Sequence, residues 1–231
     1  MKRNYIIIIL AFLLCLGVKV KDKHSKDVIV NKDLTLDGVI VVIDPGHGGL
    51  DNGAMHGGVK EDELNLKISN VLKTELESRG AIVYLTREDD QDMTKRDYNY
   101  SKQDDMYLRV RQIDAYNPNY LLSIHLNSAP VSSAWGSQVF YFNRSVNGKE
   151  MANFIHESMK EVTGTRKKIS GSSFHVLRAT KATGVLIECG FLSNGNERGQ
   201  LCNSNYHKKL AVAIADGLEK YHQSLLEKID E

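Results

Sequence analysis

Short apolar runs and amphipathic stretches alternate along most of this chain. The apolar runs are rich in valine, isoleucine and leucine and end at glycine, proline or polar residues, which predicts buried strands. Between them, apolar residues recur every three or four positions, which predicts helices. The alternation predicts an α/β fold, a single domain with a mostly parallel central sheet and helices on both faces.

The predicted elements follow from these patterns. We expect strands over residues 38–43, 81–86, 120–124, 139–142, 174–177 and 185–187. We expect helices over residues 64–76, 107–116, 150–162 and 206–229. The intervening residues 87–106 are polar and densely charged, which predicts a long loop.

The N-terminus has a different composition from the rest of the chain. Lys2 and Arg3 precede an apolar run without charge, which is the pattern of an export signal. No Ala-x-Ala-like cleavage site follows, so residues 1–18 fit either a cleaved signal peptide or an N-terminal membrane anchor. We expect residues 19–37 to form a polar spacer and residues 38–228 to form the functional domain. Export would place that domain outside the cytoplasm, with the membrane contacted only through the N-terminal segment.

Composition narrows the function classes. Lys and Arg number 30 and Asp and Glu number 29, so the charge is nearly balanced. Without a clustered basic face, we expect no nucleic-acid partner. Beyond the N-terminal run, only Cys189 and Cys202 remain, which is too few for a disulfide scaffold or a cysteine zinc site.

Three predicted strands are followed directly by a chemically active side chain. These side chains are His47, His125 and Glu188. Because the carboxyl ends of parallel strands share one edge of a sheet, we expect the three to converge. A single histidine at a strand end more often belongs to an ordinary turn. Two histidines on separate strands, accompanied by carboxylates, favour a functional site.

A second carboxylate, Glu61, lies where the glycine-rich loop after His47 enters its helix. Two histidines and one glutamate form a known catalytic zinc set, which leaves one coordination position for water. Glu61 faces the loop of His47, which favours it as the third ligand. Glu188 follows a buried aliphatic strand, which favours it as the base because burial raises a carboxyl pKa. The reverse assignment of the two glutamates is also compatible with their positions.

Other polar residues lie near this edge of the predicted sheet. Asn127 comes two residues after His125, and it either orients substrate or stabilises the turn. His175 begins the predicted strand 174–177 and is a candidate substrate contact. His156 and His222 lie within predicted helices, and we expect them at the surface. Arg87 follows a strand, and we expect it to make a structural ion pair.

Four motifs in this order resemble the zinc-dependent N-acetylmuramoyl-L-alanine amidases of the Amidase_3 type, over residues 39–222. Residues 42–49 (Val-Ile-Asp-Pro-Gly-His-Gly-Gly) resemble the family's opening motif. Lys60-Glu61 before an Asn-Leu helix resembles its second motif, and residues 123–127 (Ser-Ile-His-Leu-Asn) resemble its third. Residues 186–194 (Leu-Ile-Glu-Cys-Gly-Phe-Leu-Ser-Asn) resemble the stretch that carries the family's catalytic glutamate.

The resemblance implies one Zn²⁺ per chain, held by His47, Glu61 and His125, with Glu188 catalytic. It implies a peptidoglycan hydrolase that cleaves the amide between N-acetylmuramic acid and the L-alanine of the stem peptide. Residues 100–102 (Tyr-Ser-Lys) before a Leu-Arg-x-Arg helix resemble the sporulation members, which act on spore cortex and take part in muramic-δ-lactam formation. No extra helix is expected to plug the groove, so an accessory activator protein is a candidate partner.

Two other classes of protein would share these sequence features. A catalytically weak peptidoglycan-binding or regulatory protein could use the same fold, although such proteins usually lose one of the four site residues. A metallopeptidase with a different bond specificity would share the metal chemistry. The full set of four residues favours the active amidase.

Overall fold

The computed structural model describes residues 34–94 and 101–230. The predicted signal or anchor, and most of the predicted spacer, therefore lie outside the described residues. Among the described residues, no helix combines the length and the apolar character needed to cross a bilayer.

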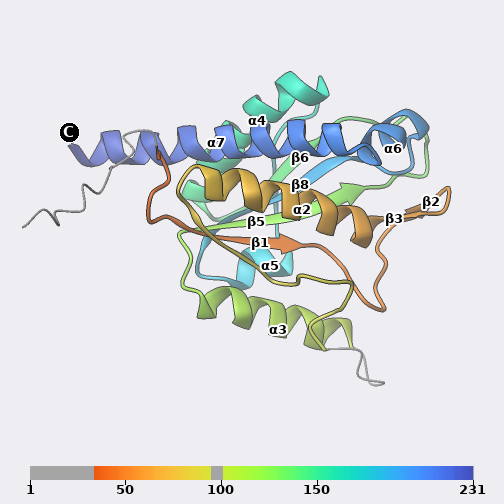
Figure 1. Ribbon diagram of the computed structural model, residues 1–231, viewed down its shortest axis with the longest axis horizontal. Coiled ribbons are helices and arrows are strands. Elements are labelled where there is room, and N and C mark those ends of the chain that lie inside the picture. Colours follow the sequence, from red (N-terminus) through yellow and green to blue (C-terminus); the bar gives the residue numbers. More distant parts are fainter. Residues whose placement is uncertain (1–33, 95–100, 231) are drawn as a thin grey trace, which may run out of the picture. The chain divides into compact units, whose positions relative to one another are not determined.

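Within the described chain, six strands form one sheet in the order β4-β1-β5-β8-β6-β7 (Figure 1). The strands are β1 (Ile40–Pro45), β4 (Ile82–Leu85), β5 (Tyr120–Asn127), β6 (Gln138–Phe142), β7 (Ser170–Ser172) and β8 (Thr183–Phe191). All neighbours pair in parallel except β6, which is antiparallel to β8. β1 and β8 flank β5, so their carboxyl ends lie side by side at one edge.

The helices divide between the two faces of the sheet (Figure 1). One face packs against α2 (Glu61–Ser78), α4 (Val146–Thr163) and α7 (Ser204–Asp230), and the other packs against α3 (Lys102–Ala115) and α5 (His175–Ala179). Side chains of a strand point alternately to opposite faces, so Val41 and Ile43 join the first core while Val42 joins the second. The predicted α/β class with a mostly parallel sheet is confirmed.

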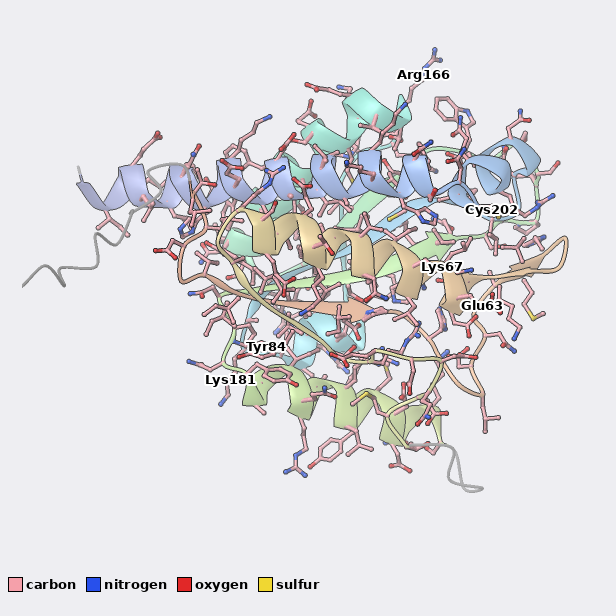
Figure 2. The ribbon with its side chains drawn as sticks, in the orientation of Figure 1. Glu63, Lys67, Tyr84, Arg166, Lys181 and Cys202 are labelled. Atoms are coloured by element: carbon pink, nitrogen blue, oxygen red, sulfur yellow. The ribbon has the colours of Figure 1, made fainter. Side chains whose placement is uncertain are left out.

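The solvent-facing side of α2 carries charges, as expected for an amphipathic helix. Glu63 and Lys67 lie one turn apart on this side, and their carboxylate and ammonium groups are 3.9 Å apart (Figure 2). Leu64, Ile68 and Leu72 on the opposite side are buried against the sheet.

One predicted strand is wrong. Residues 174–177 do not pair with the sheet; from His175 onward they form α5, whose Val176 and Leu177 pack on Val42 and Leu121. A short apolar run does not separate strand from helix by periodicity alone. The edge strand beyond β6 is instead β7, a Ser-Gly-Ser segment without an apolar pattern.

Several local features differ from the sequence-based prediction. α3 begins at Lys102 rather than at residue 107, because the Ser101 side chain accepts a hydrogen bond from the Asp104 backbone N–H and caps the helix. Besides β7, three further short elements were missed, namely β2 (Met55–His56), β3 (Val59–Lys60) and α6 (Gly195–Leu201).

The histidines expected at the surface are not fully exposed. His156 is buried in α4, where burial lowers its pKa. His222 is half-buried, and its Nδ1 lies 2.8 Å from the Tyr120 hydroxyl. Cys189 and Cys202 are free thiols, the first buried and the second exposed.

Candidate metal centre

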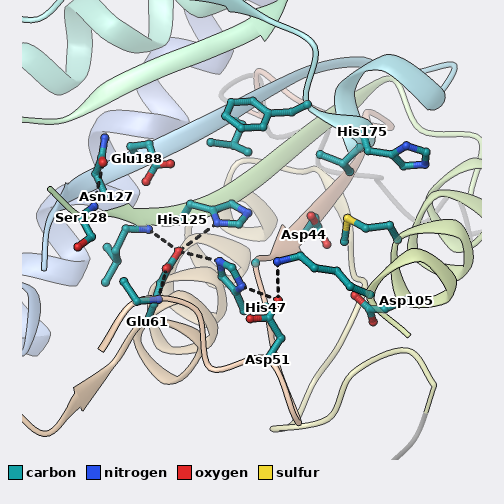
Figure 3. A pocket seen from close by; sticks show the side chains of 18 residues that line it. Asp44, His47, Asp51, Glu61, Asp105, His125, Asn127, Ser128, His175 and Glu188 are labelled. Carbon is teal, nitrogen blue, oxygen red and sulfur yellow. Dashed lines mark hydrogen bonds and ion pairs between the residues drawn. The ribbon is translucent and has the colours of Figure 1, made fainter. Parts of the chain in front are cut away.

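Three side chains from three elements converge at the carboxyl edge of the sheet. His47 follows β1, His125 lies in β5, and Glu61 is the first residue of α2. His47 Nε2 lies 3.2 Å from Glu61 Oε1, and His125 Nδ1 lies 3.1 Å from the same oxygen (Figure 3). The two imidazole rings meet edge to face, with centroids 5.0 Å apart. One potential ligand atom from each side chain therefore points to a common centre.

Two glycines make this approach possible. A Cβ at position 46 would lie 2.2 Å from the ring of His125. A Cβ at position 53 would lie 2.6 Å from Glu61 Oε2, and Gly53 also has a φ of +66°. A larger residue at either position would force the neighbouring side chain or the turn to shift. These glycines thus accommodate neighbouring side chains of the site itself.

Glu61 is held by hydrogen bonds on both carboxylate oxygens. Oε2 accepts from the Ala54 backbone N–H at 2.8 Å, and Oε1 accepts from the Leu126 backbone N–H at 3.1 Å and from Asn65 Nδ2 at 3.3 Å. Burial opposes its ionisation, but hydrogen bonds and charge from His125 and His47 outweigh it and hold the pKa of Glu61 well below its usual range. Glu61 is therefore an oriented anion.

The second ring nitrogen of His47 is also oriented. His47 Nδ1 lies 3.0 Å from Asp51 Oδ2, which in turn lies 3.1 Å from Lys102 Nζ. Burial opposes a charge on His47, but the hydrogen bonds to Asp51 and Glu61 outweigh it and raise its pKa to about 9. A carboxylate on the far nitrogen of a ligating histidine fixes the ring orientation and its tautomer. Nε2 is then the nitrogen directed at the centre.

The donor set suits a zinc-like cation. Two imidazole nitrogens and one carboxylate oxygen lie within 4.8 Å of one another. Zinc prefers nitrogen and oxygen ligands in this combination when one position remains open for chemistry. The residues present therefore fit a catalytic metal ion.

Glu188 lies beside this cluster on β8 (Figure 3). Its Oε2 is buried and has no hydrogen-bond partner in the described chain. Burial raises the pKa of Glu188 to about 7, with a further upward contribution from Glu61 and opposing contributions from His125 and His47. A carboxyl group with such a pKa can accept and release a proton near neutral pH.

Both predicted substrate contacts line the same cavity, which has a volume of about 350 Å³. Asn127 is half-buried at the end of β5, and its Oδ1 accepts a hydrogen bond from the Ser128 backbone N–H. His175 begins α5, and its Nδ1 lies 3.3 Å from Arg178 Nη2. Their contact with substrate stays a prediction.

Asp51 and Lys102 also line the cavity, and neither was expected there from the sequence. The spacing of Asp51, four residues after His47 in a glycine-rich loop, was the available signal. No local signal marked Lys102, because its place beside Asp51 depends on how α3 packs.

Comparison with known proteins finds the same family that the four sequence motifs resemble. The model of the N-acetylmuramoyl-L-alanine amidase family (Amidase_3) matches residues 41–220. The germination-specific N-acetylmuramoyl-L-alanine amidase of Bacillus subtilis (strain 168) is 30% identical over 227 residues, which cover 95% of each protein.

Solved structures agree with this match. The CwlD amidase from Clostridioides difficile, in complex with the GerS lipoprotein, has a TM-score of 0.75 and 33% identity, over 80% of this chain and 99% of that one. The catalytic domain of CwlV, an amidase from Bacillus (Paenibacillus) polymyxa var. colistinus, has a TM-score of 0.70 and 32% identity, over 79% of this chain and 97% of that one.

Proposed function

This chain belongs to the Amidase_3 family of N-acetylmuramoyl-L-alanine amidases, and from that premise we propose that the triad of His47, Glu61 and His125 holds a catalytic zinc ion beside Glu188. As an amidase of the cell wall, it hydrolyses the bond between N-acetylmuramic acid and L-alanine in peptidoglycan, outside the cytoplasm. The observation that carries the zinc proposal is the convergence of His47 Nε2 and His125 Nδ1 on Glu61 Oε1, at 3.2 and 3.1 Å.

A zinc ion bound there would polarise the scissile carbonyl and make a water molecule easier to deprotonate. Glu188, with a pKa raised by burial to about 7, is suited to accept a proton from the attacking water at its unpartnered Oε2. It then delivers that proton to the alanine nitrogen as the C–N bond breaks. The products are the lactyl carboxylate of the muramic acid and a stem peptide with a free amine.

The cavity provides surfaces for the substrate on both sides of the triad. Asn127 and His175 line it from β5 and α5, and we assign both to substrate binding. His175 is exposed, so its ring can turn toward an entering stem peptide or glycan.

We place the activity at the spore cortex, where removal of the stem peptide is a step toward muramic-δ-lactam. The similarity to a germination-specific amidase over 95% of both proteins supports this assignment. An accessory protein is a further part of the proposal, supported by the CwlD amidase having been solved together with the GerS lipoprotein. Residues 1–18 are proposed to direct export, as a cleaved signal or as an anchor.

Digestion of purified peptidoglycan tests the proposal. The metal-free protein is incubated with cortex peptidoglycan, with and without added zinc, and the soluble fragments are identified by mass spectrometry. Stem peptides that begin at L-alanine and appear only with zinc are the expected result. Binding without fragments would favour the regulatory protein, and cuts within the stem peptide would favour a metallopeptidase.

A further inference from the structure

Two buried arginines hold the backbone of the turn that carries His47. Arg87 Nε donates to the Pro45 carbonyl at 3.0 Å, and Arg87 Nη2 donates to the Gly46 carbonyl at 3.0 Å. Arg109 Nη1 donates to the Pro45 carbonyl at 2.9 Å, and Arg109 Nη2 donates to the His47 carbonyl at 3.0 Å. Three consecutive carbonyl oxygens are thus all bound by guanidinium groups.

The turn needs such support because His47 adopts a left-handed backbone conformation, with a φ of 62°. This region is unfavourable for residues with a Cβ atom. A rotation of the adjacent peptide groups would relieve the strain, but it would also move the imidazole ring away from Glu61. Hydrogen bonds from a charged donor resist this rotation more strongly than neutral ones.

Arg87 also joins the segments of two predicted ligands. The same Nη2 that donates to the Gly46 carbonyl donates to the Asp62 carbonyl at 2.8 Å. Asp62 directly follows Glu61, so this one nitrogen connects the His47 turn to the first turn of α2. Arg87 was expected to form an ion pair. Among the described residues, its guanidinium donates instead to four backbone carbonyl oxygens, the fourth being that of Asp89.

Arg109 is connected through Asp44 to β5, the strand that carries the third predicted ligand, His125. Its Nη1 lies 2.7 Å from Asp44 Oδ1, and Asp44 Oδ2 accepts from the Ser123 hydroxyl at 2.8 Å. Ser123 lies two residues before His125 on β5. Both side chains of the Arg109–Asp44 pair are almost completely buried, at 1% and 2% exposure. The pair therefore links β1, β5 and α3 behind the site.

We propose that Arg87 and Arg109 are positioning residues that preorganise the His47, Glu61 and His125 side chains, so that the metal affinity of this chain depends on them. The inference rests on the proposed metal site. Neither arginine lines the cavity, so both act through the backbone of the ligand segments. Partners that orient metal ligands typically change affinity by about 10- to 100-fold when they are lost.

The test measures zinc binding by the full chain in competition with a chromophoric chelator, at a temperature where circular dichroism shows each variant folded. Arg87→Gln and Arg109→Gln are each expected to weaken zinc binding about tenfold or more. Arg79→Gln is the matched control. Arg79 is also a multiply bonded arginine, with contacts to Glu75, Asp216 and Glu219, but it lies at the far end of α2.

The outcomes separate the inference from the proposed function. Absence of zinc binding by the wild-type chain would contradict the metal site itself. Wild-type affinity in folded Arg87→Gln and Arg109→Gln, or an equal loss in Arg79→Gln, would overturn the positioning role. If Arg109→Gln does not fold, Arg87→Lys decides. The single ammonium group of a lysine cannot replace the three separate nitrogens by which Arg87 reaches the Pro45, Gly46, Asp62 and Asp89 carbonyls. Weakened binding in Arg87→Lys supports the inference, and wild-type binding refutes it.

Discussion

Glu188 faces His125 across the boundary between β8 and β5, where the two residues pair in register. Neighbouring strands lie about 4.8 Å apart, and paired residues project to the same side of the sheet. A proposed ligand and the proposed base therefore enter one cavity from adjacent strands (Figure 3). The β5–β8 pairing provides this proximity through backbone hydrogen bonds, which is a rigid way to hold two reactive groups together.

Replacing Glu188 by glutamine removes the proposed base with little change in size. We expect turnover of peptidoglycan to fall about 10²- to 10⁴-fold, because a general base typically contributes that much. Glu157→Gln on the exposed side of α4 is the control and should leave turnover unchanged. The measurement is release of stem peptides from peptidoglycan at saturating zinc. Unchanged turnover in Glu188→Gln would remove Glu188 from the mechanism.

The stability of the metal-free protein should depend on pH through Glu188. Its pKa rises on folding from about 4.5 to about 7, so the folded state disfavours the ionised form. Stability from this group is present below pH 4.5 and is lost as the pH rises through 7. Glu188→Gln should therefore raise the free energy of unfolding above pH 7 by about 3 kcal/mol and have little effect near pH 4. Denaturant titrations at several pH values, on chelator-treated protein, measure this difference; equal stability at pH 8 would contradict it.

Asp51→Asn should weaken zinc binding by about 10- to 100-fold. Asp51 Oδ2 lies 3.0 Å from His47 Nδ1, and an amide does not hold the ring as a carboxylate does. Lys102→Gln provides the comparison, because Lys102 contacts Asp51 from an exposed position and is not itself bonded to a ring nitrogen of His47 among the described ion pairs. Its effect on zinc binding should be small. Chelator competition measures both, and equal effects of the two substitutions would argue against ring orientation by Asp51.

Gly46→Ala should disturb the site directly. The added Cβ would lie 2.2 Å from the His125 ring, so the ring or the turn must move. We expect a loss of about 1 to 3 kcal/mol in unfolding free energy, typical of overpacking, together with weaker zinc binding. Gly199→Ala in α6 is the control, because nothing lies within 4 Å of its added Cβ. Thermal unfolding and chelator competition test the pair, and wild-type zinc binding in Gly46→Ala would show that the turn adapts freely.

Local patterns in the sequence were sufficient to predict much of the fold. The Val-Val-Ile run before Pro45 identifies a buried strand and the position of its end, and the same reasoning applies to β5 and β8. Because parallel strands present their carboxyl ends at one edge, the proximity of His47, His125 and Glu188 followed from three local observations. Glu61 was included because the helix start is visible in the sequence.

Residues 174–177 show where local patterns fail. Phe174, Val176 and Leu177 fit a strand or a helix equally well, and the packing of α5 on Val42 and Leu121 decides between them. Ser170–Ser172 has no strand pattern, yet it pairs with β6 because the sheet offers it an edge. In both cases contacts with residues distant in the sequence outweigh local preference.

By itself, the sequence determined the α/β class, the positions of the strand ends and the four side chains proposed for the site, because each depends on residues close together in the chain. Only the tertiary structure decided the strand order, the place of Lys102 beside Asp51 and the hydrogen bonds from Arg87 and Arg109 to the turn that carries His47. The raised pKa of Glu188 was also decided only by the tertiary structure, since it follows from burial. Burial and hydrogen bonds between segments 40 or more residues apart, such as Arg87 with Gly46, exist only after the chain has folded.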